Sequence, residues 1–291
     1  MLPANYATAT VFRQALEARL MNLSRSEGVD LQRLRRQVSF DRLLARLFKE
    51  TKAPWALKGG YAMELRLSTA RTTSDIDLTL LQIITGNDQA RIDIILEMLQ
   101  AAAAIDLGDA FTFLVGEPIM DLDAAPYGGG RFPVEARMDG RVFAKFHIDV
   151  GVGDVVIKPL EYVQGRDWLD FAKISTTAFP AISHEQQFAE KYHAYTLPRQ
   201  ELENSRVRDL VDMLLLIRTG KLNNEKIAKA LKLTFSKRRT HAIPNQVPPP
   251  PPAWEKPFAA LAAECGLDEN IDTAVIALTT FMNKLPKITV G

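Results

Sequence analysis

The chain has 291 residues, of which 36 are Lys or Arg and 35 are Asp or Glu, so its formal net charge is only +1. With 47% hydrophobic and 24% charged residues, the composition excludes a disordered, collagenous or membrane-spanning protein. A single cysteine, Cys265, excludes an intrachain disulfide framework. We expect one large or two ordinary domains in a soluble, cytoplasmic protein without a signal sequence.

The near-zero net charge conceals a strong asymmetry along the chain. Residues 1–71 carry a net charge of +7, residues 72–170 carry −10, and residues 171–291 carry +4. An acidic middle segment therefore lies between two basic ends, so the total does not exclude a nucleic-acid partner.

The first 54 residues have leucines and valines at three- and four-residue steps, which predicts helices, with a break at Gly28. Trp55–Leu57 predicts a short buried strand that ends at Lys58-Gly59-Gly60. We expect one or two helical turns over 61–67 and a polar turn over 71–74.

Asp75–Leu80 alternates polar and apolar residues with a period of two, which predicts a strand with both aspartates on one face. A helix is expected over 87–104, capped by Asn87, and Tyr127–Arg131 is interpreted as a flexible connection. Further strands are expected over 111–115, 132–138 and 142–150, the last two joined by the hairpin signal Asp139-Gly140.

The C-terminal third has helical periodicity, with Ser183 as a candidate cap. Helices are expected from Ser183 through 195 and over 205–218, 223–233, 254–265 and 271–285, and the prolines 248–252 predict a polyproline II spacer. The expected fold class is α+β, a mixed-sheet lobe with a helical C-terminal lobe. The expected domains are 1–54 (helices that pack on the mixed-sheet lobe), 55–182 (an α/β domain) and 183–291 (a helical domain).

Two features of the middle segment indicate phosphate and metal chemistry. A Gly59-Gly60 turn between a strand and a helix lets the backbone approach a phosphate, and the helix start offers amide groups to the anion. Asp75 and Asp77 place two carboxylates about 6.5 to 7 Å apart on one strand face, a separation that a divalent ion can span.

Asp149 is a candidate third carboxylate, because it lies near the end of another predicted strand with the same alternation. Three such aspartates could hold two metal ions for a phosphoryl or nucleotidyl transfer. By itself a D-x-D pair is more often a turn, a cap or a solvated strand edge. The four histidines have no metal-ligand spacing, which argues against a zinc site.

At this point the sequence resembles a known family. The segments Leu57-Lys58-Gly59-Gly60 and Arg71-Thr72-Thr73-Ser74-Asp75-Ile76-Asp77-Leu78 look like the first motif of the AbiEii nucleotidyltransferase-like toxins, which include the MenT toxins of mycobacteria and belong to the DNA polymerase beta superfamily. Two later segments are similar to its E-K-x-x-A and R-D-x-x-D helices, Ala189–Ala194 and Arg206–Asp212. The resemblance runs from about residue 30 to about residue 220.

The resemblance implies roles for individual residues. Magnesium or manganese would be bound by Asp75 and Asp77, with Asp149 the third carboxylate, and Gly59 and Gly60 would face the triphosphate of a nucleoside triphosphate substrate. Further implied roles are phosphate contact by Lys191, the motif-four carboxylate at Asp209 or Asp212, nucleotide contacts by Lys58 and Arg66, and regulatory phosphorylation at Ser74. One departure is Tyr61, where relatives have a small hydroxyl residue.

The resemblance also implies a function, which is transfer of NMP to the 3′ end of tRNA, with translation blocked and a separately encoded antitoxin as partner. The cations between Arg218 and Arg239, together with arginines near the N-terminus, could track an RNA backbone, although a solvated helix face is an equally good interpretation. Two alternatives remain open: transfer to a protein or a small molecule, and a nucleotide-binding regulatory module without turnover, which the Tyr61 departure favours.

Overall fold

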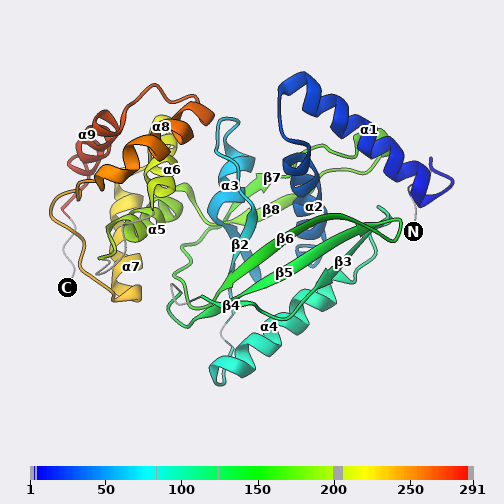
Figure 1. Ribbon diagram of the computed structural model, residues 1–291. Helices are drawn as coiled ribbons and strands as arrows, with labels where there is room; N and C mark the ends of the chain where they lie inside the picture. Colours follow the sequence, from blue (N-terminus) through cyan, green and yellow to red (C-terminus); the bar gives the residue numbers. More distant parts are fainter. Residues whose placement is uncertain (1–2, 4, 83, 123–124, 199–205, 288–291) are drawn as a thin grey trace. The chain divides into compact units, whose positions relative to one another are not determined.

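The computed structural model describes residues 3, 5–82, 84–122, 125–198 and 206–287. Its helices are α1 (Ala9–Glu27), α2 (Leu31–Leu47), α3 (Gly59–Arg66), α4 (Asp88–Ala103), α5 (His184–Thr196), α6 (Val207–Arg218), α7 (Asn224–Arg238), α8 (Glu255–Glu264) and α9 (Ile271–Met282) (Figure 1). Its strands are β1 (Trp55–Lys58), β2 (Asp75–Leu80), β3 (Phe111–Val115), β4 (Met120–Asp121), β5 (Gly129–Met138), β6 (Arg141–Gly151), β7 (Glu161–Gln164) and β8 (Ala178–Ala181).

The chain divides into two compact units. The sheet unit comprises residues 1–65, 72–153 and 162–181, and the helical unit comprises residues 66–71, 154–161 and 182–291, each within the described ranges. The fold is therefore α+β, as the sequence predicts. The domain boundaries drawn from the sequence remain predictions.

Within the described residues, the strands of the sheet unit form one mixed sheet in the order β3-β5-β6-β2-β1-β8-β7, with β4 paired to β5. Strand β2 runs parallel to β6 and antiparallel to β1. The parallel pairing of β2 with β6 aligns Asp77 with Asp149. This pairing brings two aspartates 72 positions apart in the sequence onto neighbouring strands.

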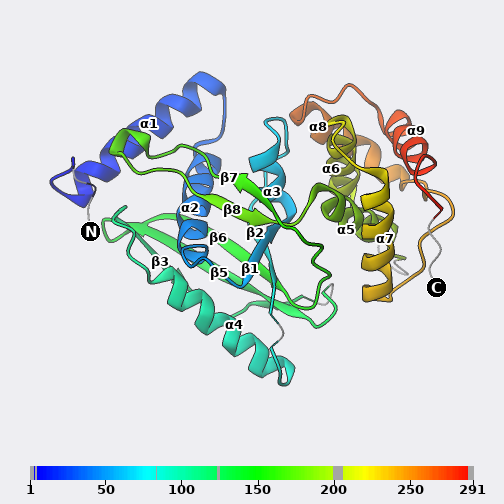
Figure 2. The same cartoon turned by 180° about the vertical axis from the view of Figure 1, so that it is seen from behind.

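One side of the sheet carries the core of the sheet unit. Helix α4 packs on β3 and β5, and α2 packs on β6 (Figures 1 and 2). The ring of Phe40 lies 4.9 Å from that of Tyr61 and 4.8 Å from that of Phe146. Along β5 the residues alternate between buried and half-buried, so every second side chain faces away from this core.

The helical unit is built around α5, which packs on α6 and α7. The hydroxyl of Ser183 accepts a hydrogen bond from the amide of Gln186 and caps α5, as the sequence predicts. Pro251 has φ −59° and ψ 142°, which is polyproline II geometry. The predicted first residue of the α6 helix, Ser205, lies outside the described residues.

Two interpretations of the sequence need correction. The segment Tyr127–Arg131 is not only a connection, because β5 begins at Gly129 and Arg131 pairs in register with Asp149. Strands β4, β7 and β8 were missed. They are two to four residues long, too short for a period-two pattern to stand out.

The hairpin and the cap predicted for the middle segment are confirmed. Asp139 and Gly140 both have positive φ, 54° and 67°, as a two-residue turn between β5 and β6 requires. Asn87 caps α4 by accepting a hydrogen bond from the amide of Ala90.

In the part of the chain that the structure describes, no helix combines the length and the apolar character that crossing a membrane needs.

Candidate active site

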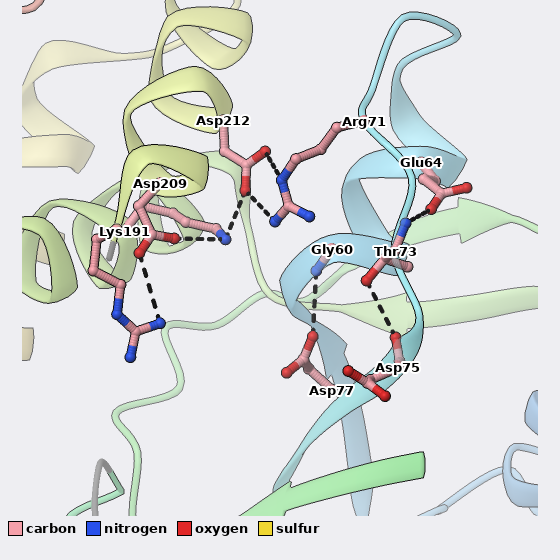
Figure 3. Close-up of polar contacts among 10 residues, drawn as sticks. Gly60, Glu64, Arg71, Thr73, Asp75, Asp77, Lys191, Asp209 and Asp212 are labelled. Atoms are coloured by element: carbon pink, nitrogen blue, oxygen red, sulfur yellow. Dashed lines mark hydrogen bonds and ion pairs between the residues drawn. The ribbon is translucent and has the colours of Figure 1, made fainter. Parts of the chain in front are cut away.

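The glycine turn and the aspartate strand meet in the sheet unit. Lys58, the last residue of β1, pairs in register with Asp77 of β2. Gly59 has φ +65°, and a Cβ atom there would lie 1.9 Å from Oδ2 of Asp77. The amide of Gly60 donates a hydrogen bond of 3.3 Å to the same Oδ2 (Figure 3). Gly59 is therefore required here, because any side chain would displace the Asp77 carboxylate.

The segment before Asp75 is held by a buried glutamate. Glu64 on α3 accepts a hydrogen bond from the amide of Thr73 at 2.5 Å and another from Nε2 of Gln37 at 2.5 Å. Burial raises the pKa of Glu64, and these hydrogen bonds partly offset the rise. A Cβ atom on Gly60 would lie only 2.5 Å from the hydroxyl oxygen of Thr73, so this segment packs directly on the glycine turn.

Three carboxylates lie on the half-exposed face of β2 and β6. Asp75 and Asp77 share one face of β2, and Asp149 on β6 is the register partner of Asp77. Nδ1 of His147 lies 3.3 Å from Oδ1 of Asp75, and the Ser74 hydroxyl donates to Oδ2 of Asp75 at 3.0 Å. The structure thus brings together the three aspartates that the sequence singles out.

Arg131 completes this group, and the sequence interpretation missed it. Its guanidinium donates to both oxygens of Asp149, at 2.8 and 2.7 Å, and lies 3.8 Å from Oδ2 of Asp75. The pKa of the Arg131 guanidinium is raised above its usual value, mainly by the hydrogen bond to Asp149. Arg131, Pro133 and Glu135 are every second residue along β5 and therefore share one face. This period of two is the signal that could have placed Arg131 on the face of the aspartates.

The residues fit a divalent cation in part. Magnesium is usually bound by one or two carboxylates together with substrate phosphates and water, and Asp75 and Asp77 offer that donor set. Asp149 gives two of its roughly four lone-pair positions to Arg131 and keeps the others. Across the described ranges, no group of three or more His, Cys, Asp or Glu residues is arranged to hold a metal ion. The three-aspartate metal site therefore remains a prediction.

A second charged cluster lies in the helical unit. Nζ of Lys191 on α5 lies 3.0 Å from Oδ1 of Asp209 and 2.7 Å from Oδ2 of Asp212, both on α6. Arg71 donates to both oxygens of Asp212 at 3.0 and 2.9 Å (Figure 3). Arg71 stands four residues before Asp75, and its pairing with Asp212 was not foreseen from the sequence.

The electrostatics of this cluster follow from burial and pairing. Burial lowers the pKa of Lys191, but Asp212 and Asp209 outweigh it, so the pKa is raised. Burial raises the pKa of Asp212, but Lys191 and Arg71 outweigh it, so the pKa is lowered. Lys191 and Asp212 therefore both stay charged near neutral pH.

Asp209 and Asp212 differ in how fully they are bonded. Asp212 is 1% exposed and is bonded by both cations, whereas Oδ2 of Asp209 is buried without a hydrogen-bond partner among the described residues. Nη1 of Arg206 lies 3.8 Å from that oxygen. Asp209 therefore has the acceptor capacity that Asp212 lacks.

Three other predicted residues are placed as follows. Arg66 is buried and donates to Oε1 of Gln187 at 2.6 Å, to Oε2 of Glu161 at 2.9 Å and to the carbonyl of Ile182. Ser74 is exposed beside Asp75. The Tyr61 side chain lies in the core, where its hydroxyl donates to Oδ1 of Asp41 at 2.6 Å, so it leaves the glycine turn clear.

Two solved structures match this chain over most of its length. The fold is similar to that of MenT4, a nucleotidyltransferase toxin from Mycobacterium tuberculosis H37Rv, with a TM-score of 0.52 and 14% identity over 94% of each chain. A second solved structure, JHP933 from Helicobacter pylori, has a TM-score of 0.47 and 15% identity over 88% of this chain and 92% of its own. A search of curated proteins finds no match.

The family follows from the sequence itself. Residues 42–278 match the model of the nucleotidyl transferase AbiEii toxin of type IV toxin–antitoxin systems. Because the match covers most of the chain, the chain belongs to the AbiEii family. The match includes the glycine turn, the three aspartates and the Lys191 cluster.

Proposed function

We propose that the protein is a metal-dependent nucleotidyltransferase that transfers NMP from a nucleoside triphosphate to the 3′ end of tRNA and thereby blocks translation. The observation that carries the proposal is the carboxylate face of β2 and β6, held beside the Gly59-Gly60 turn by the contact of Gly60 with Asp77. Family membership supports the nucleotidyl transfer and an antitoxin as partner.

In the proposed reaction, the acceptor hydroxyl oxygen forms a bond to the α-phosphorus of the nucleotide. The bond from that phosphorus to the bridging oxygen breaks, and pyrophosphate leaves. Asp149 takes the hydroxyl proton on an oxygen lone pair that Arg131 does not use. Asp75 and Asp77 would hold magnesium or manganese, which neutralises the triphosphate charge when bound.

Residues around the glycine turn and in the helical unit have proposed roles in binding the nucleotide. The glycine turn leaves backbone room for the triphosphate, with Lys58 and Arg66 as further nucleotide contacts. Lys191 contributes positive charge toward the phosphates as a point charge, and Asp209 is the motif-four carboxylate because one of its oxygens is unbonded. Phosphorylation of the exposed Ser74 would place negative charge beside Asp75 and weaken metal and nucleotide binding.

One feature of the helical unit supports RNA as the acceptor. Along α7 the basic residues Lys226, Lys229 and Lys232 are exposed and available to phosphates. The buried Tyr61 side chain leaves the glycine turn clear but supplies no small hydroxyl there, so a nucleotide-binding module without turnover remains the alternative.

The test is to incubate the protein with each α-labelled nucleoside triphosphate and total tRNA. We expect wild type to label tRNA, and Asp75→Ala or chelation of divalent ions to abolish labelling. Asp93→Ala, which removes an exposed carboxylate on α4, is the matched control and should retain activity. No labelling with any nucleotide would refute the tRNA acceptor, and labelling that survives Asp75→Ala would refute the mechanism.

A further inference from the structure

A groove of about 730 Å³ crosses the half-exposed face of the sheet unit and ends at Asp75. It runs over β3, β5 and β6, with Arg36 of α2 at its side. This volume is within the range found for pockets that bind small molecules and cofactors. Nothing in the proposed function uses the groove beyond its end at Asp75.

The groove is basic although its segment of sequence is acidic. Four cationic side chains line it, against the two carboxylates Asp75 and Glu135; the four are Arg36, Arg131, Arg137 and Lys145. Three of the four, Arg131, Arg137 and Lys145, come from β5 and β6, although residues 72–170 carry a net charge of −10. A polyanion would be attracted to this surface.

Two of the cations are able to change partners. Lys145 and Arg137 both pair with Glu135, at 2.9 and 2.5 Å, and their side chains are 70% and 41% exposed. Exposed pairs of this kind are weak, so a phosphate can replace Glu135 at little cost. Arg36 adds a further cation, because its half-buried side chain lines the groove.

The floor of the groove is apolar. Leu114 of β3 is 53% exposed, and Pro133 of β5 lies beside it. A strand of RNA with its bases unpaired presents phosphates on one side and flat apolar bases on the other, which matches this combination of cations and apolar floor.

The order of the strands assigns the groove to the acceptor. The glycine turn follows β1, on one side of β2, whereas the groove lies across β6, β5 and β3, on the other side. In an in-line displacement the attacking oxygen and the leaving group lie on opposite sides of the phosphorus. A triphosphate at the glycine turn therefore leaves the groove side to the attacking hydroxyl.

From this geometry we infer that the groove binds the single-stranded 3′ end of the acceptor RNA and delivers its terminal hydroxyl to Asp75. The inference rests on the proposed function for the direction of attack. Arg137, Lys145 and Arg36 contact the phosphodiester backbone, and Leu114 and Pro133 contact the bases. The combination of cations with an apolar floor favours RNA over an acidic peptide, because a peptide lacks the regular spacing of phosphates and bases.

The experiment measures binding of a short fluorescein-labelled single-stranded RNA by anisotropy, without nucleotide, over a salt series. Lys145→Glu and Arg137→Glu should each weaken binding about tenfold and reduce the log–log salt slope by about 0.7 per lost phosphate contact. Glu135→Gln should strengthen binding, because it removes a competing anion. Lys52→Glu, at an exposed position outside the groove, should change nothing.

The outcomes separate this inference from the proposed function. If tRNA is labelled but the groove variants change neither RNA binding nor the KM for tRNA, the groove is not the acceptor site. If binding falls as expected in a protein that labels no tRNA, the groove assignment stands and the transfer reaction is refuted. Binding of a glutamate-rich peptide with no binding of RNA would assign the groove to a protein instead. Lys145→Ala replaces Lys145→Glu if the charge reversal prevents folding.

Discussion

The two charged clusters of this protein both pair aspartates with cationic side chains but differ in their access to water. On the sheet, the side chains of Arg131, Asp75 and Asp149 are 28%, 24% and 14% exposed. In the helical unit, Lys191, Asp209 and Asp212 are 13%, 8% and 1% exposed. The sheet cluster keeps lone pairs open to solvent, whereas the helical cluster uses most of its hydrogen-bonding capacity internally.

This difference in exposure separates carboxylates that can bind a ligand from ion pairs that stabilise the interior. A half-exposed carboxylate pays little desolvation cost and remains able to bind a cation or accept a proton. A buried ion pair depends on its partner, because removing one member leaves an uncompensated charge in the interior. The sheet cluster should therefore be sensitive in activity, and the helical cluster sensitive in stability as well.

The largest effect is expected from Asp212→Asn. Removing this carboxylate leaves Arg71 and Lys191 with too little negative charge, and the free energy of unfolding should fall by about 3 to 5 kcal/mol. The matched change on the sheet is Asp149→Asn, which should cost about 1 kcal/mol or less because the pair with Arg131 is partly solvated. Urea unfolding measures both, and equal losses would contradict the comparison.

A smaller effect is expected from Gly59→Ala. The new Cβ would lie 1.9 Å from Oδ2 of Asp77 and displace that carboxylate, so kcat should fall about a hundredfold. Gly28→Ala is the control, since Gly28 has a similar φ of 68° but no atom within 4 Å of its Cβ position. Gly28→Ala should cost only stability, about 1 kcal/mol. Similar kcat values for both variants would show that Asp77 is not needed.

The smallest effect concerns acid stability of the helical unit. Burial lowers the pKa of His193 from 6.5 to about 3. Between these values the unfolded chain binds a proton that the folded chain does not, so stability falls as pH falls through this window. The loss is about 2 kcal/mol between pH 6.5 and pH 5.

The variant His193→Gln should flatten this acid dependence. The pKa of His241 is also lowered by burial, so a smaller dependence should persist in the variant. Urea unfolding followed by tryptophan fluorescence at several pH values measures the acid dependence. An unchanged slope in His193→Gln would show that His193 does not govern it.

Local patterns in the sequence predicted most of the elements. The alternation in Asp75–Leu80 gave the bounds of β2, and the capping residues Asn87 and Ser183 located the starts of α4 and α5. These features depend on neighbours within a few residues, so a single sequence contains them. The five-residue extension of α7 beyond Leu233 was missed, although the buried Phe235 continues the stripe of Ile227, Ala230 and Leu231.

The partners of the candidate site were harder to predict. The sequence indicated Gly59, Asp75 and Asp77 because they are close in the chain. It did not indicate Arg131 as the partner of Asp149, because that pair depends on the β5–β6 register. Nor did it indicate that Arg71 bonds to Asp212, 141 positions away.

The sequence by itself determined the fold class, the family, the glycine turn and the alternation that puts two aspartates on one face. Periodicity and spacing carry this information because secondary structure is local. Only the tertiary structure decided which charges are buried and paired, where the Tyr61 side chain lies, and that a basic groove ends at Asp75. Those properties come from strand order and register, which join residues that no local pattern connects.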